Sequence, residues 1–563
     1  MPDGESFKSF VQDTRGSAWR PPPGCVQMHD ILIKNGTVID GTGAPGRKMD
    51  VAVDGSRISG LYKPSEGRGA MAIDADGLVV CPGFIDIHTH SDLHLLSCPL
   101  AESKVRQGVT TELVGNCGGS AAPVLGLARS ALESSGRDLW VDVTWTTFDE
   151  YLLRLADVRT SVNVASLVGA DTLRLGVMGA GDRPPSVDEL ATMNKMLADS
   201  MVEGAFGVSS GLIYAPGCFA LTEELVSLAT TAAALGGLYA SHIRGEGRTL
   251  VEAVAEAITI GRESGCRVQI SHHKACGERN WGLVGKTLAM IEAARASGID
   301  VAFDVYPYTA SSTSLDTILP PWVREGGRDE ELSRLRDPQV RGRIKEELTD
   351  PGTDWENTVA EDGWANIVML GFRRDGNKRF DNRSVQSVAG ELGVDPADLA
   401  MDLLLDEELG VGAVFHEMSE EDVKRVISHP LAAIGSDGES EAPYGPTGSS
   451  PTHPRSYGTF PRAIRRYSME FGLFPLEEAV RKMTSLPAER IGLTDRGTIA
   501  KGMAADLVAF DPGRIRDTAT FEDPHRYPEG IVHVLVNGLP TIEHGEHTKE
   551  RAGQVLRHRV SVS

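Results

Sequence analysis

The chain has 563 residues, of which 41% are hydrophobic and 24% are charged, the balance of an ordinary globular protein. Its formal net charge of -23 argues against nucleic acid or an anionic membrane surface as a partner, because either would require a basic patch. No stretch approaches the roughly 18 consecutive apolar residues that suggest a transmembrane helix.

Both ends of the chain are expected to be tails. Residues 1–27 contain no apolar segment of the kind found in a secretory signal, so we expect a disordered tail there. Residues 546–563 follow the last predicted strand and are expected to form a C-terminal tail. The seven cysteines lack the spacing of a disulfide framework, and their odd number in a long chain predicts a reduced, cytoplasmic protein.

Short strands separated by turn residues are predicted near each end of the ordered chain. Residues 28–82 alternate apolar and polar side chains between Asn-Gly, Asp-Gly and Gly-Thr-Gly turns, and residues 496–545 repeat this pattern. Neither segment has enough strands to enclose a core alone. We therefore expect one small β-sandwich built from both segments.

The intervening residues 83–495 alternate apolar strands with amphipathic helices, which is typical of a parallel sheet. Eight alternations of this kind predict an α/β fold, a TIM-like (β/α)8 barrel that holds its functional residues at the carboxyl ends of the strands. The strand candidates are residues 79–88, 110–117, 163–169, 204–212, 238–244, 267–273, 299–308 and 431–438.

The last two candidate strands are separated by a segment far longer than an ordinary loop. Within it, residues 320–372 are expected to form a small inserted subdomain between barrel strands 7 and 8. It could act as a lid over the site, or it could pack against the rim of the barrel.

Side chains able to bind a metal occur at the ends of five predicted strands. Each alone is more simply explained as a structural residue, but their recurrence at equivalent strand ends favours one shared site. Residues two apart on a strand point to the same face, so a His-x-His pair can reach one point. The six candidates are His88, His90, Cys117, His242, His272 and Asp437.

These residue types suit a hydrolytic metal site. Zinc binds imidazole nitrogen, thiolate and carboxylate, and a catalytic zinc site keeps one position open. A nearby carboxylate can take a proton from the attacking water and return it to the leaving nitrogen.

Several motifs resemble the D-aminoacylase (N-acyl-D-amino-acid deacylase) family of the metal-dependent amidohydrolase superfamily. The resemblance runs in order from about residue 28 to residue 545. The motifs are GFIDIHTHSD, QGVTTELVGNCG, YASHIRGE, VQISHHK, DVYPY, IGSDG and HPRSYGTFPR.

The resemblance implies a metal centre and a catalytic base. Cys117, His242 and His272 would hold one tightly bound zinc ion, and a second, weaker position would lie at His88 and His90. Asp437 would act as general base and then general acid. His273 follows a ligand in the strand, should point to the opposite face, and is expected to be structural.

The resemblance also implies how a substrate would be held. Arg455 would bind the substrate carboxylate through two parallel hydrogen bonds, assisted by Lys274 and Tyr306. Tyr214 would donate a hydrogen bond in the same pocket. The loop 439–452 is longer and richer in Gly, Pro and Ser than the family pattern, which leaves the choice of amino acid open.

The predicted activity is zinc-dependent hydrolysis of N-acyl-D-amino acids to a D-amino acid and a carboxylic acid. The D configuration follows from the resemblance alone. The only predicted partner is this small-molecule substrate, with no nucleic acid and no membrane, and the oligomeric state is open. One alternative is another amidohydrolase reaction on a cyclic amide or dipeptide, against which Cys117 argues. The other is a non-catalytic scaffold relative, against which the complete set of ligands argues.

Overall fold

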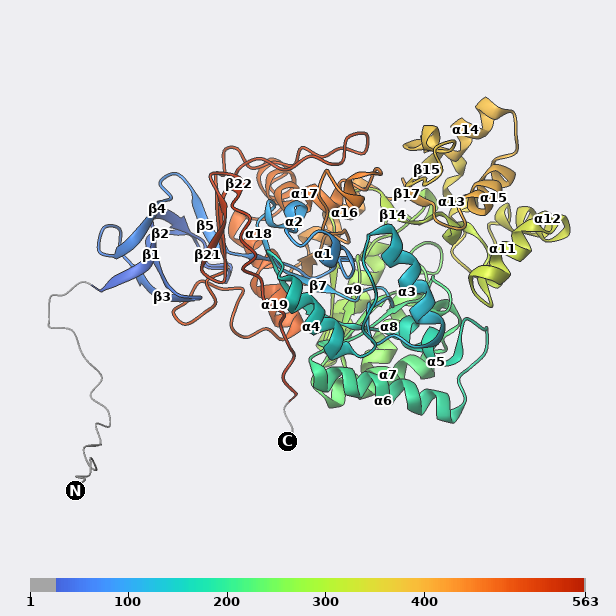
Figure 1. The fold of residues 1–563 in the computed structure, drawn as a ribbon, viewed down its shortest axis with the longest axis horizontal. Helices are drawn as coiled ribbons and strands as arrows, with labels where there is room; N and C mark the ends of the chain where they lie inside the picture. Colours follow the sequence, from blue (N-terminus) through green and yellow to red (C-terminus); the bar gives the residue numbers. More distant parts are fainter. Residues whose placement is uncertain (1–26, 561–563) are drawn as a thin grey trace, which may run out of the picture.

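A computed structural model describes residues 27–560 of the chain (Figure 1). The tail predicted at residues 1–27 lies outside this range, apart from Gln27. Within residues 27–560, no helix is both long enough and apolar enough to cross a membrane.

The first and last strands of the chain pair in one mixed sheet, which has both antiparallel and parallel neighbours and lies at the left of Figure 1. Its order is β22-β21-β20-β19-β5-β1-β2-β3, with β4 paired to β1. The seam between the two chain ends is the antiparallel pairing of β5 with β19. The strands are β1 (Met28–Val38), β2 (Arg47–Asp54), β3 (Arg57–Tyr62), β4 (Arg68–Asp74), β5 (Val79–Pro82), β19 (Leu507–Phe510), β20 (Ile531–Val536), β21 (Leu539–Glu543) and β22 (Glu546–His547).

The strands of both chain ends, where a small β-sandwich was predicted, form one continuous hydrogen-bonded sheet that bends at β1. The first half of this strand pairs with β4 and its last residues pair with β5, because the register with β2 shifts between Ile33 and Gly36. A Cβ atom at Gly36 would lie 2.6 Å from Cγ2 of Val80, so this close approach requires glycine. The bent sheet encloses a core that includes buried Val51 and Leu507.

The central part of the chain consists of parallel strands in two sheets, β6-β7-β8 and β9-β10-β11-β12-β13-β18. Only Leu167 separates β8 from β9, and a parallel bridge joins Thr89 to Gly438 beyond the ends of β6 and β18. Each of the eight predicted segments overlaps at least one of these strands. The strands are β6 (Phe84–Asp86), β7 (Val109–Val114), β8 (Asn163–Ser166), β9 (Val168–Gly169), β10 (Gly207–Gly211), β11 (Leu238–His242), β12 (Arg267–Ile270), β13 (Val301–Val305) and β18 (Ala432–Ile434).

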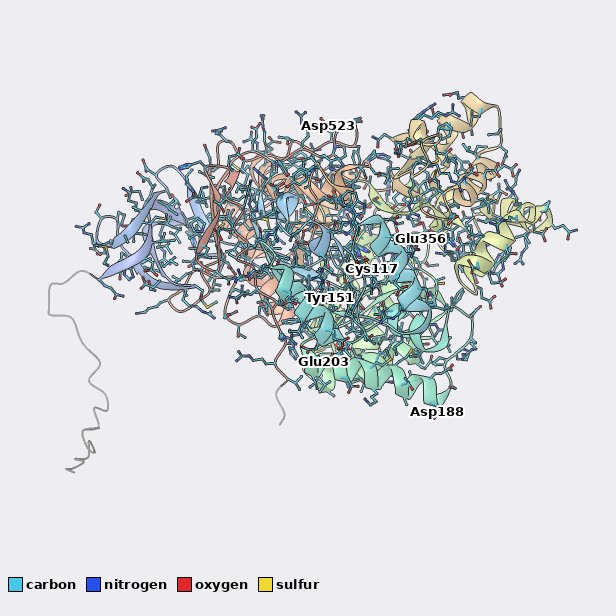
Figure 2. All side chains as sticks on the ribbon, in the orientation of Figure 1. Cys117, Tyr151, Asp188, Glu203, Glu356 and Asp523 are labelled. Carbon is cyan, nitrogen blue, oxygen red and sulfur yellow. The ribbon has the colours of Figure 1, made fainter. Side chains whose placement is uncertain are left out.

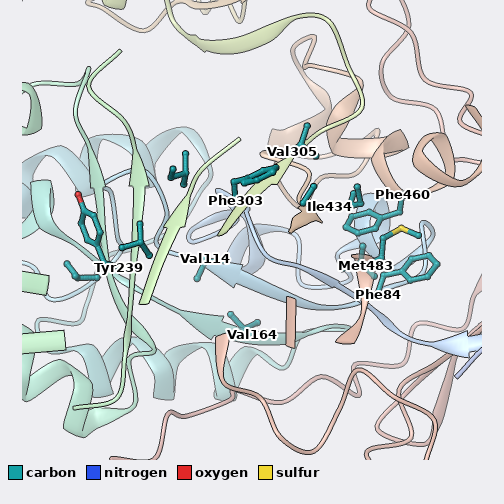
Figure 3. Close-up of a cluster of buried hydrophobic side chains, with 14 of the residues drawn as sticks. Phe84, Val114, Val164, Tyr239, Phe303, Val305, Ile434, Phe460 and Met483 are labelled. Atoms are coloured by element: carbon teal, nitrogen blue, oxygen red, sulfur yellow. The ribbon is translucent and has the colours of Figure 1, made fainter. Parts of the chain in front are cut away.

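Helices pack against these strands and bury a large apolar core (Figure 3). Phe303 and Ile434 come from the strands, while Phe460 comes from a helix and stacks on Phe84 with ring centroids 5.7 Å apart. The helices are α1 (His94–Ser97), α2 (Glu102–Val105), α3 (Gly126–Asp138), α4 (Phe148–Val158), α5 (Ala170–Met178), α6 (Val187–Glu203), α7 (Thr222–Ala234), α8 (Leu250–Ser264), α9 (Val284–Ala296), α16 (Glu420–Ser428), α17 (Arg455–Arg462), α18 (Leu476–Met483) and α19 (Ser485–Ile491).

Residues 311–415 form a lobe with a core of its own, at the upper right of Figure 1. The lobe extends beyond the predicted range 320–372 on both sides, because its first strand pairs with its last in a sheet of order β14-β17-β15-β16. Its elements are β14 (Ser311–Ser314), α10 (Pro321–Arg324), α11 (Arg328–Arg336), α12 (Pro338–Leu348), α13 (Thr358–Asp362), β15 (Ile367–Leu370), β16 (Arg383–Ser384), α14 (Val385–Leu392), α15 (Pro396–Asp406) and β17 (Gly412–Phe415).

The C-terminal segment is bound along β8, contrary to the predicted tail at 546–563. Backbone hydrogen bonds join Val164 N to Gln554 O (2.9 Å) and Leu556 N to Val164 O (2.8 Å). A third runs from Gly553 N to Thr160 O (2.8 Å). The prediction failed because main-chain pairing of this kind requires no recognisable side-chain pattern.

Gly553→Ala should loosen this segment. A Cβ atom there would lie 1.9 Å from Val162 O, so the backbone must shift and the protein should lose about 1–3 kcal/mol of unfolding free energy. Urea unfolding and limited proteolysis of the C terminus measure the effect. Gly342→Ala is the matched control because nothing lies within 4 Å of its added Cβ atom. Equal stability of the two variants would contradict the docking of this segment.

Candidate metal centre and substrate pocket

Four of the predicted site residues meet just beyond the carboxyl ends of the parallel strands. His88 follows β6, Cys117 follows β7, His272 follows β12 and Asp437 follows β18. Each is buried, and each offers one potential ligand atom within 4.8 Å of the others. Figure 2 labels Cys117 near the middle of the molecule.

The contacts within this cluster centre on the Cys117 sulfur and the Asp437 carboxylate. Sγ of Cys117 lies 3.3 Å from Nε2 of His88 and 3.5 Å from Nε2 of His272. Oδ1 of Asp437 lies 3.3 Å from Nε2 of His88 and 3.0 Å from Nε2 of His90. His90 is therefore joined to the cluster through Asp437.

His242 is the last residue of β11 and is a further predicted metal ligand. Its ring centroid lies 4.5 Å from that of His272. Both of its ring nitrogens are buried and have no hydrogen-bond partner among residues 27–560. A buried polar atom without a partner is costly, and coordination of a metal ion would satisfy one of these nitrogens.

The state of Cys117 also suits a metal ligand. Burial alone would raise the pKa of its thiol, but the charge of His88 and the nearby His242 and His272 imidazoles hold this pKa well below its usual value. The thiolate is the form of cysteine that binds metal. A sulfur and two imidazole nitrogens thus provide three ligands of the types zinc prefers.

Three site residues have left-handed backbone conformations that non-glycine residues rarely adopt. The φ angles are 50° at Cys117, 34° at His272 and 55° at Asp437. Local hydrogen bonds hold two of these turns, from His272 N to Asp304 Oδ1 (2.7 Å) and from Asp437 N to His88 O (2.8 Å). Such conformations are maintained at functional sites by their surroundings, and here they follow the strand ends directly.

Two buried carboxylates that the motif analysis did not single out orient the histidines. Asp304 lies 3.1 Å from Nδ1 of His88, and Glu246 lies 3.0 Å from Nδ1 of His272. Both contacts direct Nε2 of the ring toward the cluster, as is typical of residues behind a metal ligand. Asp304 lies within the DVYPY motif, and Glu246 follows His242 by four residues, so spacing offered a signal for each.

The residues predicted to hold a carboxylate also come together. Nη1 of Arg455 lies 2.8 Å from Oδ2 of Asp437, and Nη2 donates to Ser312 O (3.0 Å). The centroid of the Tyr306 ring lies 5.3 Å from Cζ of Arg455 and 5.6 Å from Nζ of Lys274. The Tyr306 hydroxyl is buried and has no hydrogen-bond partner among residues 27–560.

Tyr214 packs against one of the candidate metal ligands. Its ring centroid is 5.1 Å from that of His242, and its hydroxyl oxygen accepts from Oγ1 of Thr313 in the lobe (3.2 Å). His273 points away from the cluster, where its Nε2 lies 2.9 Å from Oγ1 of Thr287. The structure thus separates the neighbouring side chains His272 and His273.

His453 is a further residue that the motif analysis missed. Its Nδ1 accepts a hydrogen bond from Arg455 N (2.9 Å), so its Nε2 donates to Ala310 O (3.0 Å). The ring therefore connects the start of helix α17 to the segment that leads into β14. The contact holds the backbone of Arg455, from which the guanidinium side chain extends.

Most of these groups line one cavity of about 1660 Å³ between the strand ends and the lobe, among them Cys117, His242 and Arg455. His88, Asp304 and His273 lie outside this lining. The predicted variable loop also lines the cavity, through Glu439, Glu441 and Thr452. Glu356 of the lobe accepts a hydrogen bond from Glu246 N (2.6 Å), which connects the lobe to the metal-binding side.

Comparison with known proteins identifies the family. Residues 71–542 match the model of the amidohydrolase family. The chain is 39% identical to D-aminoacylase of Alcaligenes xylosoxydans xylosoxydans over 94% of this chain and 98% of that protein. This chain belongs to the D-aminoacylase family of amidohydrolases.

Other members of the family differ in the amino acid that their names specify. The chain is 38% identical to N-acyl-D-glutamate deacylase of the same organism, over 95% of this chain and 98% of that protein. The structure of N-acyl-D-glutamate deacylase from Bordetella bronchiseptica, complexed with zinc and a phosphonate inhibitor, superimposes with a TM-score of 0.79 at 35% identity. It covers 94% of this chain and 100% of the other.

The Glu246–Lys274 pair should be essential for stability. Both side chains are buried, and Lys274 Nζ donates to both carboxylate oxygens of Glu246 (2.6 and 2.7 Å). Glu246→Gln should cost about 3–5 kcal/mol of unfolding free energy, because it leaves the ammonium buried without a counter-charge. Burial alone would raise the pKa of Glu246, but the charge of Lys274 lowers it, so this loss should shrink as pH falls below about 4.

Urea unfolding at several pH values measures this effect. Glu292→Gln is the control, because the Glu292 side chain is 64% exposed where it pairs with His429, and an exposed carboxylate should contribute below about 1 kcal/mol. The double change Glu246→Gln with Lys274→Met should recover much of the loss. A loss as small as that of the control would show that the buried pair is not formed.

Proposed function

We propose that this protein is a zinc-dependent hydrolase that cleaves the amide bond of N-acyl-D-amino acids, giving a D-amino acid and a carboxylic acid. The supporting observation is the direct contact between Arg455 and Asp437, which puts a group suited to bind a carboxylate next to a cluster of metal ligands. The D configuration rests on the similarity to D-aminoacylase.

The proposed zinc ligands are Cys117, His242 and His272, with His88 and His90 at a second, weaker position. The unsatisfied ring nitrogens of His242 and the lowered pKa of Cys117 support the first set. Bound zinc would polarise the substrate carbonyl group and make a water molecule more acidic.

Asp437 is the proposed general base and acid. Burial would raise the pKa of its carboxyl, but the charges of Arg455 and the neighbouring histidines hold it well below its usual value. The carboxylate is therefore ionised near neutral pH and able to accept a proton from the attacking water. It would then return that proton to the departing nitrogen.

Arg455, Lys274 and Tyr306 would bind the substrate's α-carboxylate. The planar guanidinium matches a carboxylate in shape, and the unpartnered Tyr306 hydroxyl is a free donor. The substrate would replace Asp437 as the partner of Arg455, which leaves Asp437 available for proton transfer. Tyr214 would contact the substrate from the side of His242.

We also propose how the parallel strands of the central region are arranged. The parallel strands would close into a (β/α)8 barrel over residues 83–495, with the bridge between Thr89 and Gly438 as the closing contact. The cysteines among residues 27–560 are all free thiols, which supports a reducing compartment such as the cytoplasm.

Purified protein with defined zinc should hydrolyse N-acetyl-D-amino acids and leave the L-enantiomers intact. Asp437→Ala should lower kcat by about 10²- to 10⁴-fold, the usual contribution of a general acid–base group. Arg455→Ala should raise KM because it removes charge-assisted hydrogen bonds to the substrate. Steady-state kinetics on matched D and L panels measures both effects.

Asp523→Ala is the control for Asp437, because Asp523 is exposed and its carboxylate pairs with Arg526 of the same loop. Its activity should equal that of the wild type. Turnover of neither enantiomer by zinc-loaded protein would refute the proposed function.

Zinc should stabilise the folded protein and require Cys117. Removal of metal by a chelator should lower the melting temperature, and added zinc should restore it, because a ligand that binds only the folded state stabilises it by about 2.7 kcal/mol at 100 times its Kd. Cys117→Ser should lower the zinc content measured by atomic emission. Cys98→Ser, at a buried cysteine outside the cluster, should retain it. Equal zinc content in both variants would exclude Cys117 as a ligand.

A further inference from the structure

A buried lysine contacts the loop that carries Asp437. Lys104 in α2 is fully buried, and its ammonium forms an ion pair with Asp86 in β6 (2.9 Å). The same ammonium donates hydrogen bonds to Oγ of Ser436 (2.5 Å) and to the backbone oxygen of Gly438 (3.2 Å). Ser436 and Gly438 flank Asp437, and together these contacts use all three donors of the ammonium.

Asp86 connects this lysine to the strand that leads to the candidate ligand His88. Its Oδ1 accepts a hydrogen bond from Ser436 N (2.8 Å) and a longer one from His88 N (3.4 Å). Asp437 N in turn donates to His88 O (2.8 Å). Lys104 and Asp86 therefore hold the end of β6 and the turn after β18 in one buried network.

The turn at Asp437 depends on support of this kind. Its φ angle of 55° lies in the left-handed region, which costs a residue other than glycine about 1–3 kcal/mol. The Asp437 carboxylate also makes short contacts with Arg455 (2.8 Å) and His90 (3.0 Å), and a shift of the turn would break them. Because Lys104 contacts the residue on each side of Asp437, it holds both ends of the turn.

The position of Lys104 distinguishes it from a purely structural ion pair. Arg496 and Asp506 form such a pair, in which both side chains are 4% exposed and neither lines the cavity of the described chain. Lys104 likewise does not line the cavity within residues 27–560, whereas Asp437 does. The difference is that the remaining donors of Lys104 bind residues adjacent to the proposed catalytic base.

We propose that Lys104 is a positioning residue, which holds the turn at Asp437 so that its carboxylate lies between Arg455 and the neighbouring histidines. Lys104 acts through Asp437 and not on the substrate. This inference rests on the proposed function, because it concerns the alignment of the proposed base. A misplacement of about 1 Å at a reacting group can lower the rate by about 10²-fold.

The first variant is Lys104→Met, which removes the donors and keeps an unbranched side chain. Its kcat on N-acetyl-D-amino acids should fall by about 10- to 100-fold, because the base is misaligned. KM should change much less, because the groups proposed to bind the substrate carboxylate are retained. Arg496→Met is the matched control, since it breaks a buried ion pair away from the cavity and should leave kcat of the folded protein unchanged.

Two milder variants keep the test decisive if Lys104→Met does not fold. Combining Lys104→Met with Asp86→Asn removes the buried carboxylate that would otherwise lack a counter-charge, so urea unfolding should show recovered stability. The kcat of this double variant should stay low. Ser436→Ala removes one acceptor of Lys104 and should lower kcat by about 2- to 10-fold, the effect of one hydrogen bond.

A double-mutant cycle tests whether Lys104 acts through Asp437. In the Asp437→Ala background, Lys104→Met should lower kcat by less than about 2-fold, because the carboxylate that it positions is already absent. Single-turnover measurements with excess enzyme provide the sensitivity for these slow variants. A purely structural role would give the same loss in both backgrounds.

The outcomes separate this inference from the proposed function. A loss of kcat that disappears in the Asp437→Ala background supports the inference. Unchanged kcat in the Lys104 variants, or an equal loss in both backgrounds, overturns it and leaves the proposed function intact. If the wild type hydrolyses no D-substrate, the proposed function fails, and crystal structures of the double variant and Ser436→Ala decide instead. An Asp437 carboxylate displaced by about 1 Å supports the inference, and an unmoved carboxylate overturns it.

Discussion

Buried ionisable side chains converge at the carboxyl ends of the parallel strands. A thiol, imidazoles and a carboxylate there have ligand atoms within 4.8 Å of one another. At such short distances each negative charge requires a positive charge close by. The surrounding structure holds these side chains in the positions that this charge balance requires. The left-handed turns at Cys117, His272 and Asp437 direct the side chains inward, and Asp304 and Glu246 fix the histidine rings from behind. The proposed zinc ion would add a strong positive charge beside the thiolate and the carboxylate.

The same demand for charge balance extends to the substrate side of the cavity. Arg455 and Lys274 each pair with a carboxylate that also contacts a candidate metal ligand. Substrate binding and metal binding therefore share partners, and a change on one side must redistribute charge on the other. The lobe takes part in this network, because Ser312 accepts from Arg455 and Glu356 accepts from Glu246.

Sequence patterns predicted the features that depend on local periodicity and on strand ends. The parallel strands, and the gathering of His88, Cys117, His272 and Asp437, follow from alternation and from where each strand stops. Features that depend on distant pairing were not accessible in this way. β14 has the polar sequence SSTS, so the lobe boundary became visible only through its pairing with β17. The bound C-terminal segment depends on main-chain hydrogen bonds, which leave no recognisable side-chain pattern.

The seam between β5 and β19 has a consequence for the newly made chain on the ribosome. All four residues of β5 are buried in the finished protein, yet β19 is translated roughly 400 residues later. At ordinary rates of synthesis, one side of this apolar strand remains without its partner for on the order of 20 to 80 s. During that interval an exposed strand edge can pair with other chains. Chaperones that cover the N-terminal strands would therefore matter most while the rest of the chain is still being synthesised.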